Sequence, residues 1–387
     1  MPTIGHGGLA AAPERQLGKT ILLQIDGLRG LAILAVLYQH AFSHGIARLA
    51  GEHGLFPYLQ GNGWMGVSLF FILSGFVLAL PLIGTEGKMR DPAAAIAYYG
   101  RRAKRLLPLF MIGCFVGYLV NRTGPEPLLR ALTTLSMFSA REFSPSVNGP
   151  FWTLMLEIWF SILMPLLLIA AWRFGYWRLL AATVVVALVT RIVATRFTFA
   201  GLVIDPIKDS VPARLDDFVI GIVIAKLYVE GRLRDVPRWL PACGAALLAA
   251  SALIWDLVIQ GIVPAPIRAL LNLPTSIGFA CIMMACLAER SAIARVVRLW
   301  PLRVAGAMCF SIYCWHYWIM QAIDPNSLKI ERVGLFLLVT AAISVLCYKF
   351  IEFPQRSWRF LLRLEDQAMS PIIPWLRKNS EPQRATG

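Results

Sequence analysis

Three ionisable residues in an otherwise apolar segment, Asp26, Arg29 and His40, are the first candidates for chemistry in this chain. They lie in the stretch DGLRGLAILAVLYQH. A helix turns by about 100° per residue, so Arg29 and His40 are about 20° apart around the helix and about 16 Å apart along it. Asp26 and His44 fall close to the same stripe. The pattern predicts one helix face with an arginine suited to hold an anion and a histidine suited to accept a proton.

The composition around this stretch indicates a membrane protein. Of the 387 residues, 57% are hydrophobic and 15% are charged, whereas a soluble globular domain carries about 25% charged residues. Apolar runs of roughly 20 residues, the length that crosses a bilayer as a helix, recur along the chain. Lipid disfavours charged side chains by several kcal/mol, so the stripe must face a protein interior or a hydrated cavity. A buried Asp-Arg pair that only locks helix packing is the alternative interpretation.

The apolar runs predict an all-α, polytopic transmembrane bundle of about ten spans with both termini cytoplasmic. The predicted spans are about 26–47, 64–84, 106–121, 151–171, 178–197, 212–230, 239–260, 268–288, 304–323 and 334–353. With the N-terminus inside, the inner connections hold more than twice as many Lys and Arg as the outer ones, as the positive-inside rule requires. The segment 127–140 is open to two interpretations, an interfacial helix or a further half-span.

The same pattern of apolar runs divides the chain into three parts. We expect a cytoplasmic N-terminal tail (1–20), a transmembrane domain (21–355) and a cytoplasmic C-terminal tail (356–387). Residues 1–20 lack the apolar region of a signal peptide, so the first apolar run is interpreted as a retained span. The expected location is the plasma (inner) membrane, with the lipid bilayer as a partner.

The net charge of +15 does not indicate nucleic-acid binding, because the Lys and Arg residues cluster in short segments between apolar runs. The seven cysteines form no C-x-x-C pair, so neither a zinc site nor a redox dithiol is predicted. We expect no metal.

A basic cluster follows the second apolar run in the stretch YYGRRAKRLLP. On a helix Arg102 and Arg105 share one side, and so do Arg101 and Lys104. Such clusters commonly serve only as positive-inside anchors. The functional alternative is a clamp for phosphates on the cytoplasmic side, because guanidinium groups grip phosphate oxygens in pairs.

Two further spans carry polar residues. Ser74-Gly75 in GVSLFFILSGF suggests a close helix contact or a kink. Glu157 in NGPFWTLMLEIWF is the lone charge in its span. It is interpreted either as a structural partner of Arg29 or Arg214, or as a carboxylate that orients a histidine.

The later spans hold three more groups. Arg214, Asp216 and Asp217 in PARLDDFVIG read as an ion-paired helix start, with a possible role at the acceptor site. His316, among the aromatic residues of SIYCWHYWI, is interpreted as a packed or hydrogen-bonded histidine. Glu352 in IEFPQR closes the last span and is expected to pair with a basic group.

Taken in order, these motifs resemble those of acyltransferase family 3. The resemblance rests on the Arg-x10-His spacing, on GVSLFFILSGFVL, RRAKRLLP, FWTLMLEIWFSILMP, SIYCWHYWI and IEFPQR, and covers about 20–360. It implies a ten-helix bundle that takes an acyl group from cytoplasmic acyl-CoA and acylates an extracytoplasmic hydroxyl. Family members act on surface polysaccharides, peptidoglycan, Nod factors and some antibiotics.

The resemblance also assigns residues. It implies that Arg29 and His40 are essential and that Arg102 and Arg105 lie near the CoA phosphates. It matches a Trp-Ser-Leu-x-x-Glu element to Trp152, Thr153 and Glu157, with threonine in place of serine. The family's Glu-x-x-Phe-Tyr ending becomes Glu-Ile-Trp-Phe-Ser here, so Ser161 stands where a tyrosine is usual.

The resulting hypothesis is an O-acyltransferase with acyl-CoA, in particular acetyl-CoA, as co-substrate and no tightly bound cofactor. His40 acts as general base or carries the acyl group briefly, and Glu157 or Asp26 holds its ring. The candidate residues are as follows: catalytic, His40, Arg29, Glu157 and Asp26; CoA-binding, Arg101, Arg102, Arg105 and Arg29; substrate-binding, Ser74, Trp152, Thr153 and His316.

The acceptor is expected to be a carbohydrate or glycolipid. A transporter or flippase with an intramembrane ion path is the main alternative, and a non-catalytic membrane scaffold is a second. The sequence specifies neither the acceptor, nor the acyl chain, nor the oligomeric state.

Overall fold

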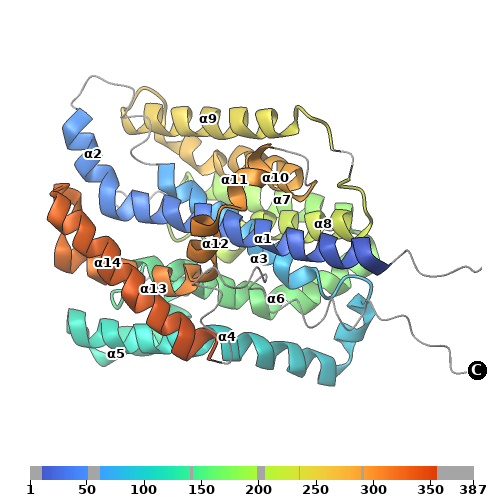
Figure 1. Cartoon of the computed structure of the whole chain (residues 1–387), viewed down its shortest axis with the longest axis horizontal. Helices are drawn as coiled ribbons and strands as arrows, with labels where there is room; N and C mark the ends of the chain where they lie inside the picture. The colour runs from blue at the N-terminus through green and yellow to red at the C-terminus, as the bar shows by residue number, and fades with distance from the viewer. Residues whose placement is uncertain are drawn as a thin grey trace, which may run out of the picture.

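The computed structural model describes the backbone of residues 11–50, 62–139, 143–197, 205–234, 236–288 and 292–354, and every regular element in these ranges is a helix (Figure 1). For 11–22 and 47–50 only the backbone is described. The α-helices are α1 (Ala11–Leu37), α2 (Ser43–Ala50), α3 (Met65–Ala79), α4 (Pro92–Asn121), α5 (Pro125–Leu132), α6 (Trp152–Phe174), α7 (Tyr176–Ala194), α8 (Val211–Val229), α9 (Leu240–Ile259), α10 (Asn272–Leu287), α11 (Ala292–Val297), α12 (Trp300–Ala307), α13 (Cys309–Ile323) and α14 (Ile330–Cys347). The predicted C-terminal tail lies outside the described residues.

Seven helical segments in the described ranges are long and apolar enough to cross a membrane. They are Asn62–Ala79, Pro92–Asn121, Gly149–Phe174, Tyr176–Ala194, Leu240–Ile259, Ala265–Leu287 and Ile330–Glu352. Each overlaps one of the predicted spans. This confirms an all-α, polytopic membrane protein.

The other three predicted spans differ from these seven. The span at 212–230 is α8, whose 19 residues include four charges, at Arg214, Asp216, Asp217 and Lys226. The span at 304–323 is divided into α12 and α13, because Met308 leaves the helical region at φ −96° and ψ 10°. The span at 26–47 falls on α1, a π-helix and α2, and α1 begins already at Ala11. The total of ten spans and the cytoplasmic placement of the termini stay predictions.

Helix α4 begins earlier than predicted, at Pro92 instead of 106. Proline is favoured in the first helical turn, and the side chain of Asp91 caps the helix by accepting a hydrogen bond from the backbone N–H of Ala93 at 3.2 Å. The basic cluster is therefore part of a helix and not of a loop. The ambiguous segment 127–140 contains α5, of eight residues, and a 3₁₀ helix at Leu135–Phe138, both too short to span a bilayer.

The long helices α4, α6, α8 and α9 run in nearly the same direction along the horizontal axis of Figure 1. Helices α2 and α5 and the start of α14 lie at one end, on the left, which we call the α5 end. The starts of α1 and α4 lie at the opposite end, which we call the Pro92 end. In the predicted topology the Pro92 end is cytoplasmic.

Glycines bring the central helices into close contact. A Cβ atom on Gly306 of α12 would collide with the backbone oxygen of Asp26 in α1, and one on Gly75 of α3 would collide with that of Phe218 in α8. Close backbone approach through small residues is the usual way in which membrane helices pack. The predicted close contact at Ser74-Gly75 is confirmed, and α1 is fixed in the middle of the bundle.

Candidate active site

His40 lies in a one-turn π-helix, Tyr38–Phe42, that interrupts the helical path between α1 and α2. A π-turn shifts the hydrogen-bond register, and such turns are frequent at functional sites. Here Asn326 spans the altered register: its side-chain Nδ2 donates to the backbone oxygen of His40 at 3.0 Å, and its Oδ1 accepts from the N–H of Gly45 at 3.4 Å. Asn326, in the loop before α14, thereby fixes the backbone around His40.

The imidazole ring of His40 pairs with that of His316 on α13. The distance from His40 Nδ1 to His316 Nε2 is 2.9 Å. The ring centroids lie 5.1 Å apart, and the ring planes are inclined by 25° to each other. The ring of Tyr317 meets His40 edge-on, with the centroids 5.9 Å apart.

This pairing corrects one expectation. The ring of His40 is held by His316, and not by Glu157 or Asp26. Glu157 binds Arg102, and Asp26 lies 3.9 Å from Arg29 on its own helix. The expectation that His316 is hydrogen-bonded is confirmed, since its side chain is fully buried and its Nδ1 lies 2.8 Å from the backbone oxygen of Tyr313.

Arg29 and His40 both lie close to α13. His40 meets His316, and Arg29 interacts electrostatically with Cys309, at the start of α13. Cys309 and His316 are seven residues apart and therefore lie on one face of α13, two turns from each other. Arg29 and His40 thus approach the same neighbouring helix, two turns apart along it.

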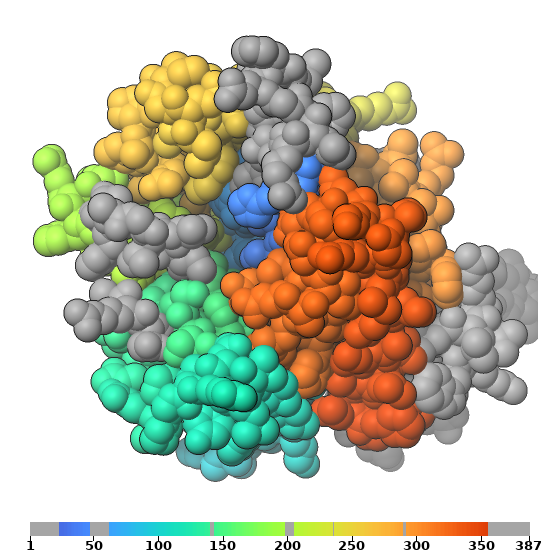
Figure 2. All heavy atoms as spheres, turned by 90° about the vertical axis from the view of Figure 1, so that its left-hand side faces the viewer, coloured from blue at the N-terminus to red at the C-terminus, as the bar shows by residue number. Residues whose placement is uncertain are grey.

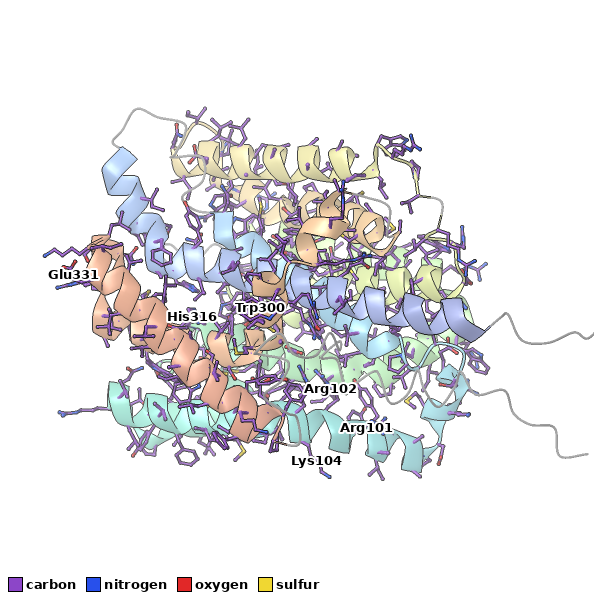
Figure 3. All side chains as sticks on the ribbon, viewed as in Figure 1. Arg101, Arg102, Lys104, Trp300, His316 and Glu331 are labelled. Carbon is purple, nitrogen blue, oxygen red and sulfur yellow. The ribbon has the colours of Figure 1, made fainter. Side chains whose placement is uncertain are left out.

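Arg102 points from α4 into the bundle (Figure 3) and pairs with Glu157 of α6. Its Nη2 lies 3.0 Å from Oε1 of Glu157, and its Nε donates to the hydroxyl of Ser161 at 3.1 Å. Ser161, at the position where a tyrosine was expected, therefore still supplies a hydrogen bond. Ser74 of α3 donates to the same carboxylate at 3.3 Å.

Arg105, one turn further along α4, reaches the region of Arg29. It interacts electrostatically with Arg29 and with Glu352, and its guanidinium lies over the ring of Phe353 at 5.0 Å. Glu352 also accepts a hydrogen bond from the hydroxyl of Ser311. Two buried atoms of this group, Nη1 of Arg105 and Oε2 of Glu352, have no hydrogen-bond partner in the described part of the chain.

We call Arg29, Arg102 and Arg105 the arginine cluster. Arg101 and Lys104 do not join it, because their side chains are exposed, and Lys104 points away from the bundle (Figure 3). As predicted, Arg102 and Arg105 share one side of α4, and this side faces inward. Arg101 makes no contact with the arginine cluster among the described residues, so its predicted role in CoA binding stays a prediction.

Thr153 and Trp152 lie near the histidine pair without contacting His40. The hydroxyl of Thr153 donates to the phenol oxygen of Tyr313 at 2.6 Å, and that phenol donates to the backbone oxygen of Pro150 at 2.7 Å. Trp152 packs on Phe143, with ring centroids 5.8 Å apart. The hydroxyl that replaces the family's serine thus fixes the turn of α13 that precedes His316.

A second buried polar group, which we call the α8 network, lies around the start of α8. Arg191 of α7 forms two hydrogen bonds with Asp216, at 2.7 and 2.8 Å, and both side chains are fully buried. Arg214 binds Asp209 at 2.6 Å and Asp217 at 3.4 Å. The prediction of an ion-paired helix start is confirmed. Arg191 lies within the predicted span 178–197, but its pairing was not predicted, because its partner Asp216 belongs to another helix 25 residues further along the chain.

Asp209 precedes α8 and lies outside the helices. Burial alone would raise its pKa, but the charges of Lys208, at 2.9 Å, and Arg214 outweigh this effect and lower the pKa to about 2. In the described ranges no cluster of three or more His, Cys, Asp or Glu side chains is arranged to hold a metal ion.

The α5 end of the molecule is hollowed above the His40 segment. In Figure 2, which faces this end, blue atoms of the α1–α2 segment are set back between α9 in yellow and α13 and α14 in orange. The arginine cluster lies further along α1 and α4, toward the Pro92 end. The two halves of the candidate site are therefore placed along one direction through the bundle.

Comparison with known proteins identifies what this arrangement resembles. A family model described as an acyltransferase domain matches residues 22–351. The chain is 26% identical over 366 residues to the peptidoglycan O-acetyltransferase OatA of Listeria monocytogenes, an alignment that covers 87% of this chain and 56% of that protein. It is 22% identical over 373 residues to the O-acetyltransferase OatA of Staphylococcus aureus, covering 90% and 59%.

A third relative is the putative peptidoglycan O-acetyltransferase YrhL of Bacillus subtilis, at 24% identity over 381 residues, covering 87% of this chain and 55% of YrhL. The chain thus spans less than two thirds of the length of the relatives that it matches. No solved structure matches the chain significantly.

Proposed function

The chain belongs to acyltransferase family 3, and from that membership and the site geometry we propose that it is a membrane O-acyltransferase. It takes an acetyl group from acetyl-CoA, which enters at the Pro92 end, and transfers it to a hydroxyl of a carbohydrate at the α5 end. The names of the relatives make peptidoglycan the first acceptor to test. The expected location is the plasma (inner) membrane.

One observation carries the proposal: one continuous helical path, α1 and the π-helix after it, brings Arg29 to the arginine cluster and His40 to His316 of α13. The spacing of about 16 Å along the helix separates an anion-binding group from a proton acceptor. Acyl-CoA has this polarity, with phosphates at one end of an extended arm and the thioester at the other.

The arginine cluster supplies the donor site. Phosphate oxygens accept paired hydrogen bonds from guanidinium groups, and Arg105 has a buried Nη1 with no partner in the described part of the chain. Arg102 is held in place by Glu157 and Ser161. We place the diphosphate between Arg102 and Arg105 and the start of the pantetheine arm beside Arg29.

His40 performs the proton transfer. The acceptor hydroxyl oxygen attacks the thioester carbonyl carbon while its proton passes to Nε2 of His40. The C–S bond then breaks, and the imidazolium returns the proton to the departing sulfur, so that an ester and free CoA result. Transient acylation of His40 followed by transfer to the acceptor gives the same products. Neither route requires a metal or a tightly bound cofactor.

The acceptor approaches from the α5 end, where the depression above the His40 segment opens (Figure 2). Thr153, Trp152, Ser74 and His316 are at most indirect contributors to acceptor binding, since each is engaged in contacts within the bundle.

The test measures release of free CoA from acetyl-CoA by membranes that contain the protein, with and without peptidoglycan fragments or other glycans. We expect acceptor-dependent CoA release by the wild type, loss of release in His40→Ala and weaker release in Arg102→Ala. If a labelled solute crosses the membrane without any CoA release, the chain is a transporter and the proposal is wrong.

A further inference from the structure

The pair formed by His40 and His316 fixes which nitrogen of His40 can act as a base. We propose that His316 is a positioning residue that holds His40 in the tautomer with hydrogen on Nδ1, which leaves Nε2 as the proton acceptor. This inference rests on the proposed function for its catalytic meaning, although the tautomer itself can be observed independently.

The hydrogen-bond pattern of His316 gives the first step. Its Nδ1 lies 2.8 Å from the backbone oxygen of Tyr313 and 3.2 Å from that of Ile312. Carbonyl oxygens only accept hydrogen bonds, so Nδ1 of His316 carries the hydrogen. A neutral imidazole has one N–H, and therefore Nε2 of His316 presents a lone pair.

The second step follows at His40. Its Nδ1 lies 2.9 Å from that Nε2. Since Nε2 of His316 is the acceptor, Nδ1 of His40 is the donor and carries the hydrogen of the neutral ring. The remaining nitrogen, Nε2 of His40, then bears the lone pair and has no hydrogen-bond partner within the described residues. It is the atom free to meet a substrate hydroxyl.

The surroundings make the chain of bonds rigid. His316 is fully buried, where a charged imidazolium would lose its hydration, so the neutral form is favoured. Tyr313, whose carbonyl orients His316, is itself fixed through its phenol to Pro150 and Thr153 of the α6 region. At the other end Asn326 holds the backbone of His40.

The arrangement has a direct consequence for the reaction. When Nε2 of His40 takes a proton, the ring becomes an imidazolium, and its Nδ1–H bond to His316 becomes a stronger, charge-assisted hydrogen bond. In serine hydrolases a carboxylate stabilises the imidazolium in this way. Here a neutral imidazole stabilises it, so no negative charge has to be buried beside His40 in the bundle interior.

Two substitutions separate positioning from packing. His316→Gln places an amide oxygen near the position of Nε2 and can still accept from His40, whereas His316→Phe fills the same space without an acceptor. We expect His316→Phe to lower kcat about 10²-fold or more, with KM for acetyl-CoA changed less than about twofold. His316→Gln should retain kcat within about tenfold. A role in packing alone would leave the phenylalanine variant the more active of the two, and that order would overturn the proposal.

A spectroscopic measurement on the wild type tests the tautomer without any substitution at 316. Nitrogen-15 labelling of the five histidines, with the His40 signals assigned from their loss in His40→Ala, distinguishes protonated from unprotonated ring nitrogens. We expect a protonated Nδ1 and a bare Nε2 on His40 at neutral pH. A hydrogen on Nε2 instead would refute the inference, even if the protein releases CoA. Conversely, absent CoA release together with the expected tautomer would reject the proposed function alone.

Discussion

Two groups of buried charges in this bundle differ in how completely they are paired. In the α8 network Arg191 donates two short hydrogen bonds to Asp216, and Arg214 binds two aspartates. Within the described residues, Nε of Arg191 is the one arginine nitrogen of this network that has no hydrogen-bond partner. The side chain of Asn272 accepts from Arg214 when its amide is turned so that the oxygen faces the guanidinium. Such a network holds helices together and leaves little for a ligand to bind.

The candidate active site is paired less completely. Within the described residues, Arg105 and Glu352 each keep a buried atom without a hydrogen-bond partner, and Nε2 of His40 is open. A membrane interior tolerates such atoms poorly unless a substrate completes them. The α8 network is thus the more completely paired of the two groups, as we expect of charges that hold helices together, and the candidate active site leaves more atoms for a substrate to bind.

The largest expected effect separates the two regions at His40. His40→Ala should lower acetyl-CoA turnover by about 10²–10⁴-fold, because the proton acceptor is gone, while the thermal unfolding midpoint in detergent stays near that of the wild type. Turnover is measured as CoA release in purified membranes. Near-normal turnover would remove His40 from the mechanism and would erase the distinction drawn between the two regions.

The α8 network should respond in the opposite way. Asp216→Ala leaves Arg191 as an uncompensated buried charge and should destabilise the protein by about 3–5 kcal/mol. The double variant Arg191→Leu/Asp216→Leu should recover much of that loss. Unfolding midpoints in detergent measure both.

The control for this prediction is Glu230→Ala, which breaks the partly exposed pair with Lys226 at the end of α8. It should change stability by less than about 1 kcal/mol. If Asp216→Ala stays fully stable but loses turnover, the α8 network belongs to the reaction and the comparison fails.

A smaller effect is expected in the arginine cluster. Arg105→Lys keeps the charge opposite Glu352 but loses the planar fork that grips phosphate oxygens. KM for acetyl-CoA should rise about tenfold, which corresponds to one lost charge-assisted hydrogen bond. The matched substitution Arg101→Lys, on the exposed side of α4, should change KM less than about twofold. Equal effects of the two would place the donor site elsewhere.

The sequence predicts the parts of this site that depend on local helical geometry. The common face of Arg29 and His40 was predicted from the helix period, and the shared side of Arg102 and Arg105 was predicted from their spacing of three, whereas the spacing does not specify which pair faces inward. The apolar runs predict most of the spans in the same way, because length and hydropathy are local properties.

The parts that were missed depend on tertiary packing. His316 is 276 residues from His40, and only the close contact of α1 with α12 and α13 brings the two rings together. The π-turn at His40 has no sequence pattern of its own. The predicted span at 106–121 begins too late for a local reason, because Asp91-Pro92 is a helix start with a recognisable cap.

The smallest expected effect concerns Asp209 and is confined to low pH. Lys208 and Arg214 hold the pKa of Asp209 at about 2, below the usual 3.8. Because the folded-state pKa is lowered, the carboxylate stabilises the protein above about pH 4, and this stabilisation is lost as the pH falls from about 4 to about 2. Wild type should therefore lose stability over this range more steeply than Asp209→Asn, which is less stable than wild type at neutral pH.

The matched control is Asp324→Asn, since the exposed pair of Asp324 with Arg332 contributes little. The measurement is the thermal unfolding midpoint of each variant between pH 2 and pH 7. If the midpoints of wild type and Asp209→Asn change with pH in parallel, Asp209 is not stabilised by its ion pairs in the α8 network.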